Sequence, residues 1–347
     1  MRLLLALIFL SFQVFAQEKD KVDKTIEKSI DYILKKQKND GSIYDHNHAV
    51  TMTSLAIMAY AAAGHQPDDP TKEGESMRKA LDFVLQEKHQ NNAGYFGHSD
   101  GSRMYGHGII TLMLAEMAGM GINKKQDDII RARLEKAIQL ILWSQKQKNE
   151  NDKNQYGGWR YEPNSRDSDL SVTIWQLMSL RAANDAGISV PKKAIDDAVN
   201  YLKQCYHSER KNNKITNRKS AFAYHPGRGP EFAMAAAGAL AMQVCGQYDA
   251  DETKGAADWM MNKKINYNER FFFYGTYYFA QSMYQRGDKY AEHAKKQVEL
   301  TLLKNQQPDG SWEPQNGEER NAGRIYATAM GVLSLSVTYH FLPIYQK

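Results

Sequence analysis

The chain has 347 residues, of which 42% are hydrophobic and 24% charged, enough for one large core or for two ordinary domains. A formal net charge of +5 is too small to indicate nucleic-acid binding. Two cysteines exclude a disulfide scaffold, and the chain has no His-Glu-x-x-His or Cys-x-x-Cys spacing of the kind that holds zinc. We therefore expect neither a metal nor a cofactor.

The first 16 residues have the organisation of a secretory signal peptide. Arg2 precedes a short apolar run, and the stretch 14–16 forms a small-x-small cleavage site. The apolar run is too short to span a bilayer, and no later run is long enough. We therefore expect an exported protein, periplasmic or secreted, without a transmembrane segment. Residues 17–347 are expected to form a single, monomeric domain.

Six pairs of predicted helices follow in chain order. In the first member of each pair, apolar residues recur three and four positions apart, as in an amphipathic helix. The second member is more apolar and must be buried on nearly all sides. Glycines such as Gly64 and Gly187 end several second members. The pairs are 26–36 with 49–63, 77–86 with 109–118, 129–143 with 171–186, 194–205 with 231–245, 253–261 with 274–284, and 290–304 with 324–338.

One loop sequence recurs between the members of a pair. The stretch from Gln306 to Trp312 reads Gln-Gln-Pro-Asp-Gly-Ser-Trp, and residues 37–43 repeat its Gln, Asp, Gly and Ser without a gap. Residues 157–159, Gly-Gly-Trp, form a weaker copy. Asp-Gly-Ser favours a turn, the glutamine can bond to backbone groups left open at a helix end, and the tryptophan offers a packing surface. We call this loop the clasp.

Twelve helices joined by a repeated clasp predict an all-α (α/α)6 toroid, in which an inner ring of apolar helices lies inside an amphipathic outer ring. An open solenoid of helix hairpins is the alternative. Closure is favoured because the second helices are too apolar to line an exposed concave face.

The clasp resembles the QW repeat of squalene and oxidosqualene cyclases. The whole mature chain resembles the terpenoid cyclase and protein prenyltransferase superfamily, and most closely its exported bacterial prenyltransferase and squalene oxidase repeat proteins. The resemblance implies the toroid, but a fold does not fix a reaction. The segments that carry it are Tyr105-Gly-His-Gly, Asp169-Leu-Ser-Val-Thr-Ile-Trp-Gln, Tyr274-Gly-Thr-Tyr-Tyr, and Asp309-Gly-Ser-Trp with Gly323-Arg-Ile-Tyr.

In such a toroid the clasps and the starts of the inner helices surround the mouth of a central cavity. Ligand sites favour the loop-bearing end of a closed scaffold, so the polar and aromatic residues at these helix starts are the candidates. Each of them could instead be an N-cap or a solvated residue. The candidates for chemistry are Asp167, Asp169, His107, Arg324 and Tyr326. The candidates for ligand binding are His48, Tyr105, Tyr224, His225, Arg228, Glu231, Tyr274 and Tyr277.

The sequence leaves three functions open. The first is binding of, or action on, a polar or anionic ligand such as a glycan. The loop 206–229 carries six basic residues against one acidic residue and is expected to overhang the mouth. A lyase acting on a uronic acid would use a cation with a Tyr or His base, as Arg324 with Tyr326 would provide. Another function that the sequence leaves open is a non-catalytic cell-envelope module whose mouth loops hold a protein.

The remaining function that the sequence leaves open is that of a class II terpene cyclase. Residues 166–171, Arg-Asp-Ser-Asp-Leu-Ser, resemble the Asp-x-Asp-Asp motif of those enzymes, with Asp169 in the place of the general acid. Leu170 stands where the third Asp is expected, and the polar mouth does not suit a polyprene. The resemblance implies aromatic walls that stabilise carbocations by cation–π contact.

Overall fold

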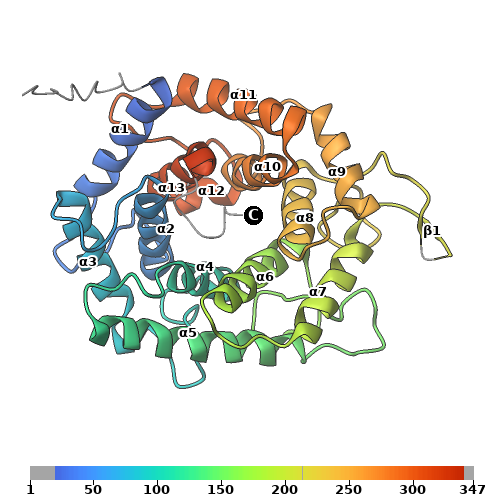
Figure 1. Cartoon of the computed structure of the whole chain (residues 1–347), viewed down its shortest axis with the longest axis horizontal. Coiled ribbons are helices and arrows are strands. Elements are labelled where there is room, and N and C mark those ends of the chain that lie inside the picture. The colour runs from blue at the N-terminus through green and yellow to red at the C-terminus, as the bar shows by residue number, and fades with distance from the viewer. Residues whose placement is uncertain (1–19, 213, 340–347) are drawn as a thin grey trace, which may run out of the picture.

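The computed structural model describes residues 20–212 and 214–339, so the predicted signal peptide lies outside the described residues. The helices form two concentric rings (Figure 1). The outer ring comprises α1 (Lys21–Lys35), α3 (Lys72–Val84), α5 (Lys124–Gln145), α7 (Lys192–Cys205), α9 (Asp251–Met261) and α11 (Asp288–Asn305). The inner ring comprises α2 (Ala49–Ala62), α4 (Arg103–Glu116), α6 (Leu170–Asp185), α8 (Phe232–Val244), α10 (Phe272–Arg286) and α13 (Arg324–Leu335).

The inner ring is closed, because α13 packs against α2 as well as against α10. The outer ring meets itself where α11 contacts α1. The predicted α/α toroid is therefore confirmed, and the open solenoid is excluded. None of the helices in the described residues is long and apolar enough to cross a membrane.

The inner helices are buried on all sides, as their composition requires. Every residue of α8 after Phe232 is buried, and seven of the twelve from Ala233 to Val244 are alanine or glycine, which lets the neighbouring helices approach closely. Trp175 of α6 is also buried and stacks on Tyr277. Trp143 of the outer helix α5, by contrast, is 48% exposed.

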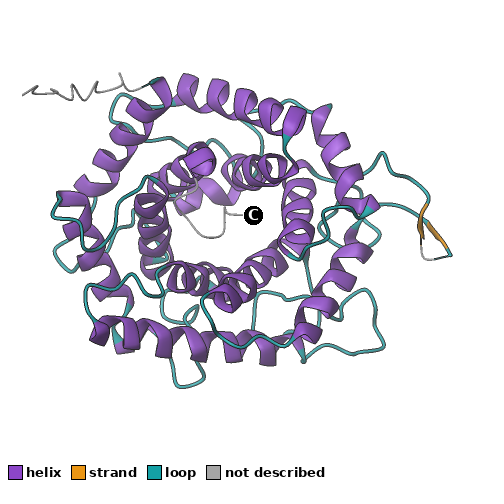
Figure 2. Cartoon of the chain, in the orientation of Figure 1, coloured by secondary structure: helices purple, strands orange, loops and turns teal. Residues whose placement is uncertain are grey.

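Several short elements were not predicted. They are the 3₁₀ helices η1 (Glu87–His89) and η2 (Ser336–Tyr339), the helix α12 (Gly317–Ala322), and an antiparallel hairpin of β1 (Arg210–Lys211) and β2 (Lys214–Ile215). The hairpin projects outward from the outer ring, away from its centre (Figure 2). Two of the basic residues of this loop pair with α9, Arg210 with Glu252 at 2.8 Å and Arg218 with Asp251 at 2.7 Å. The expectation that the basic loop overhangs the mouth is therefore wrong for the hairpin.

A clasp joins four of the six outer helices, α1, α3, α5 and α11, to the next outer helix; the copy from Gln90 to Phe96 was not predicted from the sequence. The glutamine amide of each clasp donates to the carbonyl of a glycine in its own loop and to a backbone carbonyl of the following outer helix. This bridging role replaces the helix-end role that we expected. The acceptors are Gly41 and Ser76 for Gln37, Gly94 and Arg133 for Gln90, Gly157 and Ala194 for Gln145, and Gly310 and Thr25 for Gln306.

The glycine of each clasp lies directly against the backbone of that next helix. Gly310 has a φ of +91°, and a Cβ there would lie 2.1 Å from the carbonyl oxygen of Lys28. The other three clasp glycines also have φ near +90° and would place a Cβ at 2.1 to 2.3 Å from a carbonyl oxygen. Glycine is therefore required both by the backbone conformation and by the close approach.

Replacing Gly310 by alanine should destabilise the protein by about 3 kcal/mol, because a left-handed conformation and a backbone clash add together. Gly187 is the matched control, since its φ is +79° but nothing lies within 4 Å of a Cβ there. Gly187→Ala should cost only about 1 kcal/mol. Urea denaturation of the two variants measures the difference in their free energies of unfolding. Equal losses would mean that close packing of Gly310 against α1 does not add to the cost of the substitution.

Candidate functional site

A continuous network of polar side chains joins the N-terminal ends of α4, α6, α10 and α13 with the loop before α8, at one end of the ring. Asp169, the N-cap of α6, lies at its centre and is fully buried. Its Oδ1 accepts the N–H of Val172 at 2.8 Å and the hydroxyl of Ser171 at 2.6 Å. Its Oδ2 accepts from Arg160 at 2.9 Å. Both carboxylate oxygens therefore hold donors, as a buried charge requires.

Arg160 connects Asp169 with the loop that precedes α8. Its Nη1 lies 3.3 Å from the hydroxyl of Tyr224 and 3.4 Å from Nε2 of His225. Its guanidinium also lies 4.4 Å from the ring centroid of Tyr161, within cation–π range. The hydroxyls of Tyr161 and Tyr224 are hydrogen-bonded to each other. One cation thus links two loops whose contacting residues, Arg160 and Tyr224, are 64 residues apart in the chain.

Two further tyrosines join the network through Ser171. The hydroxyl of Tyr105, from α4, bonds to the Ser171 hydroxyl. The hydroxyl of Tyr274, from α10, donates to the Ser171 carbonyl at 3.0 Å. The rings of Tyr105 and Tyr161 lie 5.8 Å apart, and both side chains remain partly exposed. We call Tyr105, Arg160, Tyr161, Asp169 and Tyr224 the mouth cluster.

Glu319, from the short helix α12, extends the network to α13. Its carboxylate accepts the backbone N–H groups of Phe273 at 3.2 Å and Tyr274 at 2.8 Å, and the hydroxyl of Tyr326 at 3.2 Å. Phe271, which precedes α10, has a φ of 61° and makes no side-chain cap. Glu319 therefore caps α10 from a distant part of the chain, where the helix dipole favours a negative charge.

Burial sets the protonation of these groups. It raises the pKa of Asp169, against the lowering effects of the hydrogen bonds from Ser171 and Val172 and of the Arg160 charge. It raises the pKa of Glu319 to about 7. It also raises the pKa values of Tyr105, Tyr274 and Tyr326 well above the ordinary value, so these hydroxyls remain protonated donors at neutral pH.

Seven of the thirteen predicted site residues lie in this network. Six of them make the contacts described above, and Asp167 joins through an ion pair with Arg160 at 3.3 Å. The seven are Tyr105, Asp167, Asp169, Tyr224, His225, Tyr274 and Tyr326.

His107 lies apart from the network and is fully buried. The N–H of Phe96 donates to its Nδ1 at 3.4 Å, and its Nε2 lies 3.2 Å from the carbonyl of Ala137. In three other clasps a threonine hydroxyl receives the equivalent N–H, for example Thr173 from Trp159. Burial lowers the pKa of His107 to about 4. We therefore assign a neutral, structural histidine to this clasp.

The remaining predicted residues also make other contacts. Arg324 pairs with two acids beside the clasp, Asp309 at 2.8 Å and Glu313 at 3.2 Å. Tyr277 is buried against Trp175, and Nδ1 of His48 lies 2.8 Å from the carbonyl of Asp100. The last two residues, Arg228 and Glu231, have exposed side chains.

Four residues of the network were not predicted from the sequence. Arg160 and Tyr161 directly follow the clasp residue Trp159, and this adjacency was an available signal. Ser171 sits two residues after the predicted cap. Glu319 had no such signal, since the connection between α11 and α13 is shorter than those between α5 and α6 and between α7 and α8. Within residues 20–212 and 214–339, no three His, Cys, Asp or Glu side chains converge in a way that could hold a metal ion.

The geometry can now be compared with known proteins. The family model of the prenyltransferase alpha-alpha toroid domain matches residues 2–150, 72–272 and 161–342. The chain belongs to this family. No curated protein matches it in sequence.

Solved structures share the toroid at low sequence identity. An inactive variant of an α-1,6-mannanase of Salegentibacter sp. HEL1_6, in complex with α-1,6-mannotriose, is 10% identical with a TM-score of 0.62, covering 91% of this chain and 98% of its own. The type II terpene cyclase MstE from Scytonema is 14% identical with a TM-score of 0.58, covering 93% and 99%. A family 76 glycoside hydrolase from a bovine Bacteroides thetaiotaomicron strain is 11% identical with a TM-score of 0.59, covering 92% and 78%. These likenesses establish the fold alone.

The raised pKa of Glu319 predicts a pH-dependent stability. Below pH 4.5 the carboxyl is protonated in both the folded and the unfolded state. As the pH rises from 4.5 to about 7, the unfolded state loses the proton first, so roughly 3 kcal/mol of folding free energy is lost across this window. Glu319→Gln should abolish this loss, as measured by urea denaturation between pH 4.5 and 8.

Glu318→Gln is the control for this experiment. Glu318 lies next to Glu319 but its side chain is exposed, and its hydrogen bond with Arg270 lowers its pKa. Any effect of Glu318→Gln on the pH dependence of stability should be small and of opposite sign, because the stabilisation from the Glu318–Arg270 pair is lost as the pH falls. An unchanged pH profile in Glu319→Gln would contradict a buried, titrating carboxyl.

Proposed function

We propose that the mouth cluster binds a polar, glycan-like ligand at the end of the ring where the inner helices begin. The observation that carries this proposal is the combination of three partly exposed tyrosines with the ion pair between the buried Asp169 and the partly exposed Arg160. Sugars present hydroxyls that both donate and accept, together with apolar ring faces. Tyrosine hydroxyls and ring faces complement both features.

Three circumstances support a glycan over other ligands. Sites of this kind combine aromatic surface with a few oriented polar groups, as the mouth cluster does. The mannanase of the same fold is in complex with α-1,6-mannotriose, which makes neutral manno-oligosaccharides natural first probes. Export, expected from residues 1–16, would also bring the protein into contact with such glycans.

The cyclase alternative rests on Asp169 and on the fold shared with MstE. Burial raises the pKa of Asp169, which suits a general acid. However, both of its oxygens accept hydrogen bonds, and Arg160 lies at 2.9 Å. A carboxylate whose two oxygens already hold these donors is not directed at a ligand from which it could protonate an alkene. The contacts therefore support ligand binding better than Asp169 acid catalysis.

Isothermal titration calorimetry with neutral manno-oligosaccharides tests the proposal. Tyr224→Phe should weaken binding about fivefold to tenfold, because one hydroxyl bond to the ligand and its link to Tyr161 are lost. Tyr156→Phe is the matched control, since Tyr156 bonds to Asp197 on the outer helix α7. Manno-oligosaccharide binding that neither substitution affects, or no binding of any manno-oligosaccharide, would contradict the proposal.

The same samples separate the alternatives. Polyprene substrates should give no product with the wild type. A product that disappears in a folded Asp169→Asn variant would establish the cyclase function instead. Binding of neither ligand class would favour the interaction module.

A further inference from the structure

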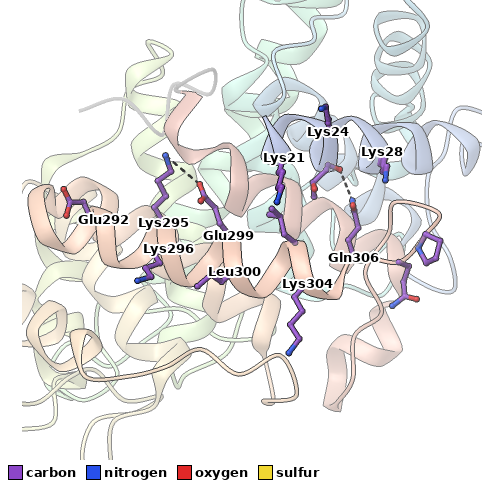
Figure 3. Close-up of a pocket in the computed structure, with 14 residues that line it drawn as sticks. Lys21, Lys24, Lys28, Glu292, Lys295, Lys296, Glu299, Leu300, Lys304 and Gln306 are labelled. Carbon is purple, nitrogen blue, oxygen red and sulfur yellow. Dashed lines mark hydrogen bonds and ion pairs between the residues drawn. The ribbon is translucent and has the colours of Figure 1, made fainter. Parts of the chain in front are cut away.

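A groove of about 1000 Å³ lies on the outside of the ring, where the first outer helix, α1, meets the last, α11 (Figure 3). Six lysines line it against two glutamates, Glu292 and Glu299, an excess of four positive charges. The whole chain carries a net charge of only +5. This groove therefore concentrates most of the net charge of the protein. Its lysines are Lys21, Lys24 and Lys28 from α1 and Lys295, Lys296 and Lys304 from α11.

Most of these cations are not neutralised locally. Lys295 lies 3.8 Å from Glu299, whereas four others make no ion pair with any residue that the structure describes. Lysines on other outer helices commonly pair with an acid one turn away, such as Lys192 with Asp196 at 2.6 Å. The contrast indicates a surface that lacks its counter-charge. The four are Lys21, Lys28, Lys296 and Lys304, and all are exposed.

The groove also presents apolar surface between its charges. Leu300 is 62% exposed, the most exposed large hydrophobic side chain among the described residues, and lies one turn from both Lys296 and Lys304. Leu303 lies beside it. The α11 wall runs from Glu292 to Lys304, a length of about 18 Å at 1.5 Å per residue. Cations therefore recur along both walls of an elongated groove with leucine at its centre.

We propose that this groove binds a linear anionic polysaccharide. A polymer with a negative charge on each repeat would meet lysines along both walls, while the C–H faces of its sugars would pack on Leu300 and Leu303. A planar lipid surface does not fill a concave groove. An acidic helical segment would need a row of apolar anchor sites, and the groove offers only two leucines. The proposal does not depend on the mouth cluster.

The probes are polygalacturonate oligomers of increasing length, with neutral dextran, poly-glutamate and phosphatidylglycerol vesicles for comparison. Affinity for polygalacturonate should rise with length until the oligomer spans about 18 Å, and should fall as salt screens the lysines. Dextran should not bind. Poly-glutamate should bind more weakly, because it offers no sugar face to the leucines.

Lys296→Glu combined with Lys304→Glu should weaken polygalacturonate binding at least about tenfold, because two attractions become repulsions. Lys125→Glu combined with Lys136→Glu, on the outer helix α5, makes the same charge change elsewhere and should leave binding within about twofold. Leu300→Ser should weaken binding about threefold by removing apolar contact. Tyr224→Phe, in the mouth cluster, should have no effect, which separates this site from the proposed function.

Three results would overturn the proposal. One is an equal loss of polygalacturonate affinity in both double variants, which would show that net charge alone determines binding. Another is poly-glutamate or vesicle binding as tight as that of polygalacturonate and insensitive to Leu300→Ser. The third is polygalacturonate binding that is lost in Tyr224→Phe and kept in the α11 double variant, which would place the anionic glycan at the mouth.

Discussion

The hydrogen bonds of one glutamine amide in each clasp are the constraint on which the rest of the structure depends. Each amide ties its own turn to the next outer helix, and Gln306 does so across the point where the chain closes on itself, through the carbonyl of Thr25. These groups are buried or partly buried, so leaving them unpaired would be costly. The clasp glycines then permit an approach that no other residue could make. A local sequence repeat thereby specifies a closed ring.

Closure has a consequence for chemistry. Because every inner helix begins just after a clasp or its equivalent loop, the N-terminal ends of the inner helices gather at one end. Such ends leave backbone N–H groups that need acceptors. Two carboxylates supply them, Asp169 locally for α6 and Glu319 from a distance for α10. The same carboxylates hold Arg160 and Tyr326, so helix capping and site construction use the same residues.

The fold was predictable because its signals are local and repeated. The two helix types differ in periodicity, and the clasp at 306–312 recurs at 37–43. The mouth cluster was only partly predictable. Asp169 and the tyrosines stand at helix starts, whereas Arg160 and Glu319 contribute through contacts with residues 64 and 45 positions away. His107 also stands at a helix start but lies outside the mouth cluster, because it fills a structural position that threonine fills in other clasps. Position at a helix start therefore does not distinguish a residue of the site, such as Asp169, from a structural residue, such as His107.

A crystal structure of the protein with a bound neutral manno-oligosaccharide tests the central claim most directly. The account predicts sugar density over the rings of Tyr105 and Tyr161, with ligand hydroxyls bonded to Tyr224 and Arg160. It also predicts that the Asp169–Arg160 contact persists in the complex. Density only outside the mouth, or a complex in which Asp169 leaves Arg160 and faces the ligand alone, would contradict the account.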